Sequence, residues 1–269
     1  MHTVCLMGPP GSGKTTMACL TCVNKPIHVI DIDRKISSMH SLKPSITKGD
    51  ITLIEIRERL MEGSLVDRVK QQAGNVKPTM QPQGWIRFAQ AIENLCKTDD
   101  FNACNTLLID SWSMASDHLI RLILYHNTTK GAAATFSPRE WGAFLQMEKE
   151  AITVVIDVAK SFNKDLIVTV HERISEIPGE QTKVLRDATG DRQFVGQMDM
   201  KISPSIQGQF GLEMARYFEE VYGLNIKIEN NKPKWICKVK PDGKRDLRTS
   251  FNVGEQVEFE PDFRKIWRQ

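Results

Sequence analysis

A chain of 269 residues with 41% hydrophobic content is long enough to bury a substantial core, and we expect one domain over residues 1–269. The net charge of +3 is too small to indicate nucleic-acid binding by itself, and six cysteines scattered along the chain favour buried thiols over a disulfide framework. No apolar stretch approaches the roughly 20 residues that cross a bilayer, and no secretory signal is recognisable, so we expect a soluble, intracellular protein without membrane contact.

Apolar runs alternate with helical patterns along much of the chain. Residues 3–7 form a short apolar run that ends in a Gly/Pro-rich turn, and a helix-compatible stretch follows at residues 14–22. Further apolar runs lie at residues 27–32, 51–56, 106–109 and 165–170. Continuous apolar runs are typical of parallel strands covered on both faces. Their alternation with helices predicts a three-layer α/β domain with a mostly parallel sheet.

The clearest helix covers residues 141–159, where apolar side chains recur at helical spacing. Its start is well marked. Ser137 suits the N-cap, Pro138 suits the first helical position, and Glu140 is placed to close a capping box.

Two segments, residues 127–136 and 174–209, fit no regular element, and long loops in a compact domain are often functional. Beyond them, residues 221–228 and 235–239 predict two strands joined by a turn at residues 230–233. Their antiparallel pairing would extend one edge of the sheet. This C-terminal basic hairpin region covers about residues 219–250.

The strongest motif lies between the first strand and the first helix, where the sequence matches G-x-x-x-x-G-K-[ST]. Small residues are needed there because backbone N–H groups must wrap a phosphate, and the helix adds its positive end. We therefore predict ATP and Mg²⁺ as cofactors, with Lys14 on the β- and γ-phosphates and Thr15 in the Mg²⁺ shell. The predicted nucleotide-binding residues are Gly8, Pro9, Pro10, Gly11, Ser12, Gly13, Lys14, Thr15 and Thr16.

An acid at the end of a later strand completes the predicted metal site. The apolar run at residues 106–109 ends in Asp110. An acid emerging from a buried strand can hold Mg²⁺ through water, so we predict Asp110 as the partner of Thr15 on the metal.

This order of motifs resembles the RecA-type ATPase core, in particular the core-only RecA-like proteins of bacteriophages, some of which act in single-strand annealing and recombination. The resemblance rests on the P-loop and on the strands that end at Asp33, Asp110 and His171. In such proteins an acid after the second strand activates the attacking water, and Asp33 occupies that place. The family more often has glutamate there, and Asp31 is a competing candidate.

The resemblance also implies roles for His171 and for the two long segments. The corresponding strand of RecA-like proteins ends in a polar residue, commonly glutamine, that senses the γ-phosphate, and a histidine can also donate to a phosphate oxygen. The loop that follows contacts DNA in that family, which predicts DNA contact for residues 174–209. Residues 127–136 lie where the other DNA-contacting loop is expected.

Basic residues cluster near the end of the chain. They would either contact single-strand phosphates or reach the γ-phosphate of a neighbouring subunit from the tip of the hairpin, as basic residues do in assembled RecA-like rings and filaments. The predicted residues for this trans-acting role are Lys240, Lys244, Arg245 and Arg248.

These observations predict an ATP-hydrolysing protein that binds single-stranded DNA and self-associates into a ring or filament. We place it in the cytoplasm, that of the host cell if a phage encodes it. Two other functions remain open. A small-molecule kinase would use Arg173, Arg186 and Arg192 as a lid, and a nucleotide-gated assembly or packaging ATPase would contact DNA only indirectly.

Overall fold

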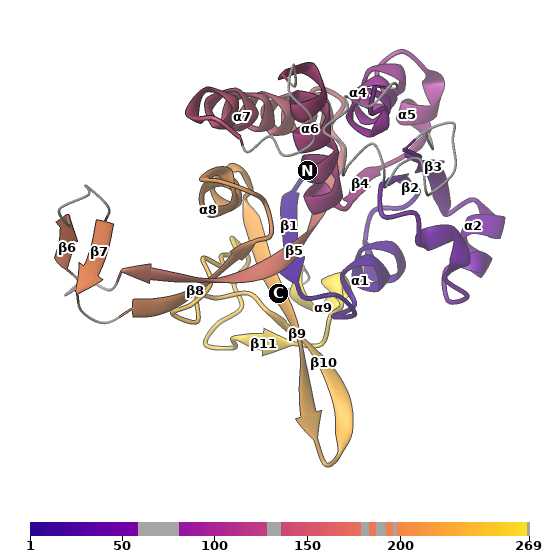
Figure 1. Cartoon of the computed structure of the whole chain (residues 1–269). Coiled ribbons are helices and arrows are strands. Elements are labelled where there is room, and N and C mark those ends of the chain that lie inside the picture. Colours follow the sequence, from indigo (N-terminus) through magenta and orange to yellow (C-terminus); the bar gives the residue numbers. More distant parts are fainter. Residues whose placement is uncertain (59–80, 128–135, 179–182, 187–191, 196–197, 268–269) are drawn as a thin grey trace.

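The computed structural model describes residues 1–58, 81–127, 136–178, 183–186, 192–195 and 198–267 (Figure 1). A nine-stranded sheet has the order β11-β10-β9-β1-β5-β4-β2-β3, with β8 paired to β5 outside this path. The strands from β9 to β3 are parallel, and β10 and β11 add antiparallel strands at one edge. The predicted fold class, an α/β P-loop fold with an antiparallel C-terminal extension, is confirmed.

Seven of the eleven described strands follow predicted runs, whereas β6, β7, β8 and β11 were not predicted. The strands are β1 (Thr3–Gly8), β2 (Ile27–Asp31), β3 (Ile51–Glu55), β4 (Thr106–Asp110), β5 (Asp165–Pro178), β6 (Lys183–Arg186), β7 (Arg192–Val195), β8 (Met198–Pro204), β9 (Glu220–Glu229), β10 (Lys232–Lys238) and β11 (Glu258–Phe259).

Helices cover both faces of the sheet because neighbouring side chains of each buried strand point to opposite faces. Cys5 and Met7 of β1 belong to the apolar cluster that holds α4, α6 and α7, whereas Val4 and Leu6 belong to the cluster that holds α1 and α9. The helices are α1 (Lys14–Thr21), η1 (Ile36–Ser38), α2 (Lys43–Lys48), α4 (Gly84–Leu95), α5 (Asp99–Ala103), α6 (Trp112–Asn127), α7 (Pro138–Ser161), α8 (Phe210–Glu213), η2 (Met214–Tyr217) and α9 (Phe263–Ile266). Among the described helices, none combines the length and apolar character that a membrane crossing requires.

The longest described helix, α7, begins as its sequence predicts. The Ser137 side chain accepts a hydrogen bond from the Glu140 amide, the Glu140 carboxylate accepts from the Ser137 amide, and Pro138 takes the first position. This capping box satisfies two amides that a helix start leaves without partners.

The interpretation of residues 174–209 as irregular is wrong for the described residues up to Pro204, which form strands, whereas residues 205–209 lie in no helix or strand. Strand β5 continues beyond the sheet to Pro178 and pairs with β8 in an antiparallel ribbon, and β6 pairs with β7 farther out (Figure 1). We call the β5–β8 ribbon from Glu172 outward the arm. Its strands carry many polar residues because the arm leaves the core, and Ile174 there is 64% exposed. Of the other segment, residues 128–135 lie outside the described residues.

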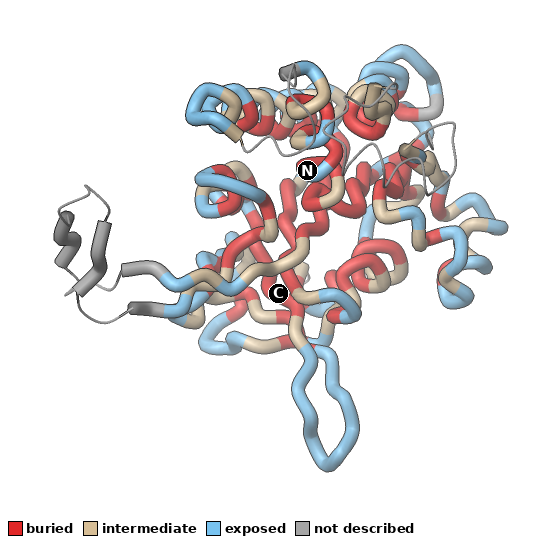
Figure 2. Tube along the Cα trace, in the orientation of Figure 1, coloured by how far each residue is buried: buried red, intermediate tan, exposed pale blue. Residues whose placement is uncertain are grey.

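The predicted C-terminal hairpin is present as β9 and β10. Asn230 and Asn231 form its tip with φ angles of 51° and 58°, a left-handed conformation that asparagine tolerates and that two-residue hairpin turns require. Figure 2 shows that its outer half is exposed, while its base joins the buried sheet. The hairpin therefore projects from the body of the protein.

A buried acid in α7 makes the stability of this fold depend on pH. Burial raises the pKa of Glu148 from 4.5 to about 7, although its carboxylate accepts a 2.7 Å hydrogen bond from Trp112. The folded protein thus retains a proton that the unfolded chain loses between these pH values, so the free energy of unfolding falls as pH rises from about 4.5 to about 7. Glu148→Gln should remove this loss and stabilise the protein above pH 7 by up to about 3 kcal/mol.

Urea unfolding at pH 5 and pH 8 measures the effect. The variant and the wild type should differ little at pH 5 and clearly at pH 8. Glu150→Gln, at an exposed position on the same helix, is the control and should leave the pH dependence unchanged. An equal effect of Glu148→Gln at both pH values would contradict the assignment.

Candidate nucleotide site

The turn between β1 and α1 has the backbone shape of a phosphate-binding loop. Gly11 and Gly13 have φ angles of 78° and 91°, which L-residues with a side chain rarely adopt. A Cβ atom at Gly8 would lie 2.5 Å from Ser12 Oγ and 2.6 Å from the carbonyl oxygen of Leu224. Glycine is therefore required at position 8 because Ser12 and the Leu224 carbonyl approach its backbone closely. At positions 11 and 13 it is required because of the positive φ angles.

The interior of this loop holds polar groups suited to an anion. Ser12 Oγ is buried and has no hydrogen-bond partner among the described residues. Lys14 is 4% exposed, and its ammonium donates to the carbonyls of Gly8 and Pro9 at 2.7 and 3.0 Å. Burial, assisted by the charge of Lys35, lowers the pKa of Lys14 to about 8. A phosphate would supply the anionic partner that this desolvated ammonium lacks.

The remaining predicted loop residues lie around this interior. Pro9 is half-buried and Pro10 is exposed on the outer side of the turn. Thr16 is half-buried in the first turn of α1, directly after Thr15.

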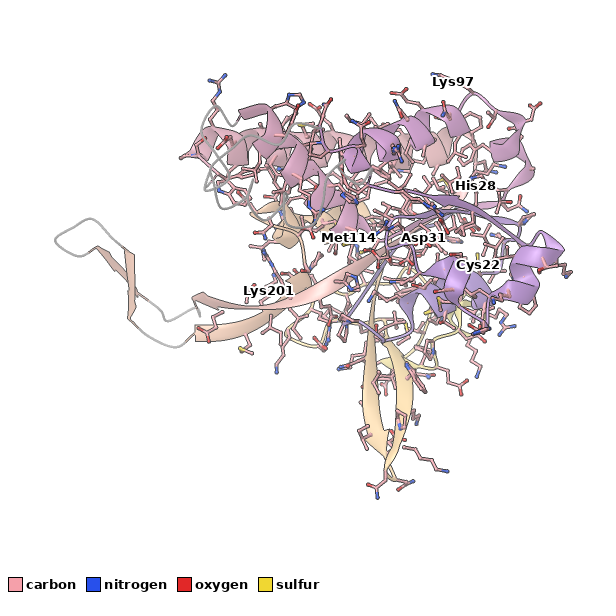
Figure 3. All side chains as sticks on the ribbon, turned by 45° about the vertical axis from the view of Figure 1, so that its right-hand side comes forward. Cys22, His28, Asp31, Lys97, Met114 and Lys201 are labelled. Carbon is pink, nitrogen blue, oxygen red and sulfur yellow. The ribbon has the colours of Figure 1, made fainter. Side chains whose placement is uncertain are left out.

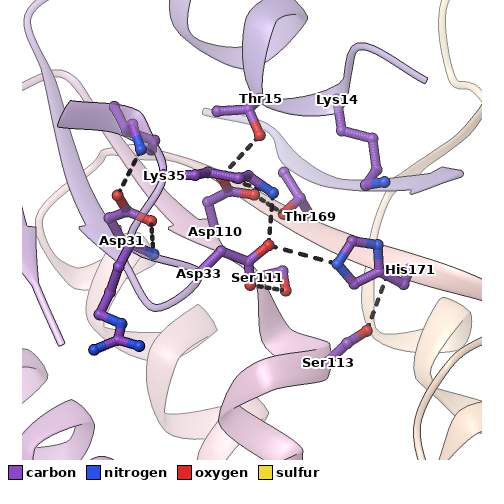
Figure 4. Close-up of polar contacts among 12 residues, drawn as sticks. Lys14, Thr15, Asp31, Asp33, Lys35, Asp110, Ser111, Ser113, Thr169 and His171 are labelled. Atoms are coloured by element: carbon purple, nitrogen blue, oxygen red, sulfur yellow. Dashed lines mark hydrogen bonds and ion pairs between the residues drawn. The ribbon is translucent and has the colours of Figure 1, made fainter. Parts of the chain in front are cut away.

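Thr15 and Asp110 form the predicted pair. The Thr15 hydroxyl donates to Asp110 Oδ2 at 2.8 Å, and Thr169 on β5 donates to Asp110 Oδ1 (Figure 4). A hydroxyl beside a carboxylate is a set of hard oxygen ligands that suits Mg²⁺. Within the described ranges no group of three His, Cys, Asp or Glu residues could hold a metal ion unaided. These residues therefore fit Mg²⁺ held partly by phosphate oxygens.

Asp33 lies in the same polar cluster, just beyond β2. It accepts hydrogen bonds from Ser111 Oγ at 2.8 Å and from Lys35 Nζ at 2.6 Å, and His171 Nε2 lies 3.5 Å from its Oδ2. Burial by itself would raise the pKa of Asp33, but the hydrogen bonds from His171, Lys35 and Ser111 hold it well below its ordinary value. Asp33 is therefore ionised, and both of its oxygens contact donors in this arrangement.

Asp31, the competing candidate, is placed differently. Its side chain is fully buried and accepts hydrogen bonds from the amides of Arg34 and Ile36 at 2.8 and 2.9 Å. Burial raises the pKa of Asp31 to about 6. Both carboxylate oxygens stabilise the turn that follows β2, whereas the side chain of Asp33 lies in the polar cluster with Ser111 and His171.

His171 lies where the sheet becomes the arm. Its amide donates to Ser113 Oγ at 3.0 Å, and its imidazole faces Asp33 (Figure 4). The next residue, Glu172, already pairs with Pro204 of β8. The side chain that contacts the polar cluster is thus one residue from the start of the arm.

Two residues near the site carry no sequence motif. Lys35 contacts Asp33 and lies 3.9 Å from Asp110 Oδ2. Trp235 on β10 donates from its indole to the carbonyl of Gly11 at 3.3 Å, and a Cβ at Gly13 would lie 3.4 Å from its ring. The C-terminal hairpin therefore contacts the P-loop. Neither position stands out in the sequence, because Lys35 lies in the connection after β2 and Trp235 lies on a strand distant in sequence from the P-loop.

The expectation that four basic residues lie at the hairpin tip is wrong, because they all follow β10. Arg245 is 7% exposed and forms two hydrogen bonds with Glu172, at 2.7 and 3.0 Å, and one with Asp242 at 2.9 Å. Arg248 donates to the carbonyls of Ala215 and Phe218. A run of basic residues in a sequence does not show which of them has a buried acid as partner.

The other two basic residues are Lys240, which is half-buried, and Lys244. The Lys240 ammonium donates to the carbonyl of Gly254, and Lys244 is exposed. Lys201 of β8, labelled in Figure 3, pairs with Asp246 at 2.8 Å. The segment after β10 is therefore tied to the root of the arm by Arg245 and along the arm by Lys201.

A sequence model described as "AAA domain" matches residues 2–250. The chain belongs to this AAA domain family. A comparison with curated proteins gave no match.

Among solved structures, this AAA domain chain is similar to a KaiC-like protein from Pyrococcus horikoshii, with 14% identity, a TM-score of 0.40 and coverage of 96% of this chain and 88% of that one. It is also similar to the flagellar accessory protein FlaH from Methanocaldococcus jannaschii, with 10% identity, a TM-score of 0.41 and coverage of 96% and 83%.

Arg245 in this AAA domain chain should act on stability. Arg245→Met leaves the Glu172 carboxylate, itself 8% exposed, without its bidentate partner and should lower the free energy of unfolding by about 3–5 kcal/mol. The double variant Arg245→Met/Glu172→Met removes both charges and should recover much of this loss.

Denaturant unfolding measures both variants. Arg264→Met is the control, because Arg264 is 52% exposed in its pair with Asp262, and it should change stability by less than about 1 kcal/mol. Equal effects of Arg245→Met and Arg264→Met would contradict a buried structural role for Arg245.

Proposed function

We propose that this P-loop protein binds ATP with Mg²⁺ between residues 8–16 and Asp110, and that it hydrolyses ATP. The pairing of Thr15 with Asp110 at 2.8 Å beside a buried Lys14 carries the proposal. The backbone amides of the loop and Lys14 would hold the β- and γ-phosphates, and Thr15 and Asp110 would hold Mg²⁺. The bound Mg²⁺ would neutralise charge on the β- and γ-phosphates.

Asp33 and His171 supply the groups that the reaction needs beyond binding. We propose that Asp33 orients and deprotonates the attacking water, and that His171 donates to a γ-phosphate oxygen. His171 faces Asp33 at 3.5 Å, so one imidazole lies within reach of both the base and the phosphate side of the cluster. A change in its contacts on hydrolysis would be passed directly to Glu172 and the arm.

We further propose that the arm and the basic C-terminal segment bind single-stranded DNA in recombination, repair or annealing. The support is the position of the arm one residue after His171, together with the exposed Lys244 and the half-buried Lys201 beside it. In this arrangement nucleotide state would bias the arm between two positions, and DNA affinity would follow the nucleotide.

Filter binding of a labelled oligothymidylate to the full chain tests this proposal. Affinity should be higher with a non-hydrolysable ATP analogue and Mg²⁺ than without nucleotide. It should also fall with salt, with a log–log slope of about −0.7 for each phosphate contacted. Lys14→Ala should weaken nucleotide binding roughly 10- to 100-fold and abolish the nucleotide effect on DNA. Lys48→Ala, at an exposed lysine, is the control.

A DNA affinity that changes neither with salt concentration nor with added nucleotide would contradict the DNA proposal. Normal nucleotide affinity in folded Lys14→Ala would contradict the ATP proposal. ATP turnover only in the presence of a small acceptor would favour a kinase. Arg173 is one of the three arginines that would form the lid of a kinase. In the described structure it donates a hydrogen bond to the carbonyl of Gly208 near the root of the arm.

We also propose that the chain self-associates into a ring or filament through the hairpin, which would suit a nucleotide-gated assembly ATPase as well. Ile226, Ile228 and Trp235 are 36%, 70% and 44% exposed. The β9–β10 register places Ile226 opposite Trp235 and Ile228 opposite Pro233, so these side chains share one face. An exposed apolar face on a projecting element is typical of a contact between proteins.

Light-scattering mass measurement with an ATP analogue tests the assembly. Ile228→Lys should shift the protein toward the monomer. Val154→Lys replaces an apolar side chain that is 52% exposed on α7 and should leave assembly unchanged. A wild type that remains monomeric with nucleotide and DNA would refute this proposal.

A further inference from the structure

The ammonium of Lys35 lies between two carboxylates that end different strands. It is 2.6 Å from Asp33 Oδ2, just after β2, and 3.9 Å from Asp110 Oδ2, at the end of β4. Asp33 is 10% exposed and Asp110 is fully buried, so Lys35 neutralises an acidic pair with little access to water. Without a cation, two such carboxylates would repel each other strongly.

The same ammonium faces the P-loop. The oxygen of Asp110 that it approaches is the one to which the Thr15 hydroxyl donates at 2.8 Å. The charge of Lys35 also acts on Lys14, which lies inside the loop. Two ammonium groups from separate segments therefore converge on one region, and the region between them suits an anion.

Lys35 has the freedom to change partners. Its side chain is 39% exposed, and it lies in the connection between β2 and η1. A lysine is a compact charge on a flexible stem, so it can exchange one oxygen partner for another at low cost. Asp33, by contrast, also accepts a hydrogen bond from Ser111 and faces His171, so it keeps two contacts that do not involve Lys35.

We propose that Lys35 leaves Asp33 when a nucleoside triphosphate binds and donates instead to an oxygen of the terminal phosphate. This inference rests on the proposed ATP site and adds to it a residue that distinguishes triphosphate from diphosphate. The exchange also removes one of the two side chains that contact Asp33 Oδ2, the other being His171, and so opens that oxygen to a further hydrogen bond from water. In the nucleotide-free protein, the ammonium of Lys35 neutralises the charge on this oxygen, and it does so only until a triphosphate binds.

Equilibrium binding to the full chain in Mg²⁺ tests the exchange without measuring activity. Calorimetry with a non-hydrolysable ATP analogue and with ADP is done on the wild type, Lys35→Met and Lys35→Arg. Lys35→Met should lower the affinity for the ATP analogue by about 10-fold or more, because the terminal phosphate loses a partner. The affinity for ADP should change by less than about 2-fold. Lys35→Arg keeps the charge and should retain most of the preference. Lys48→Met is the control for loss of a surface lysine.

Asp33→Asn provides a second measurement. It removes the partner that holds Lys35 in the free protein, so affinity for the ATP analogue should rise, and this rise should disappear in Asp33→Asn/Lys35→Met. Unfolding midpoints confirm that each variant is folded.

The outcomes separate the two proposals. If the wild-type protein binds neither the ATP analogue nor ADP, the proposed ATP site is wrong and this inference falls with it. Wild type that binds both, with equal losses or no losses in Lys35→Met, overturns the role of Lys35 alone.

Discussion

The site depends on one buried carboxylate. Asp110 has no exposed surface, and its two oxygens accept hydrogen bonds from Thr15 of α1 and Thr169 of β5. A buried carboxylate without such donors is costly, so the first helix, β4 and β5 must keep their relative positions for Asp110 to keep its hydrogen bonds. The same contacts place the hydroxyl and the carboxylate side by side, as a hard cation would need. Stability and the geometry of the nucleotide site therefore rest on the same group.

The second organising feature is the path from this site to the arm. His171 faces Asp33, and Glu172 beside it is held by Arg245, which also contacts Asp242. These contacts form a continuous polar chain from the phosphate side of the sheet to the segment after β10. Contiguity alone does not make a switch, since both sites must bias one two-state element. The arm begins directly after His171, and it contacts the segment after β10 through Lys201 and Asp246.

Local sequence signals predicted the fold and the P-loop well, because each depends on neighbouring residues. The apolar runs gave the parallel strands, Ser137 and Glu140 gave the start of α7, and the glycines gave the loop. The arm was missed because a ribbon outside the core has no apolar pattern. Arg245 was misplaced because its partner Glu172 is distant in sequence. Lys35 and Trp235 carry no motif, and only the folded chain brings them to the P-loop.

The bond between Trp235 and the carbonyl of Gly11 has a thermodynamic consequence. Trp235 contacts the phosphate loop and is also part of the exposed apolar face of the hairpin. If subunits meet through that face, ligand occupancy and subunit association share a residue, and linkage makes their influence reciprocal. If bound ATP raises the association constant of the subunits by some factor, association raises the affinity for ATP by the same factor. The midpoint of a nucleotide titration would then move with protein concentration, which an isolated P-loop would never show.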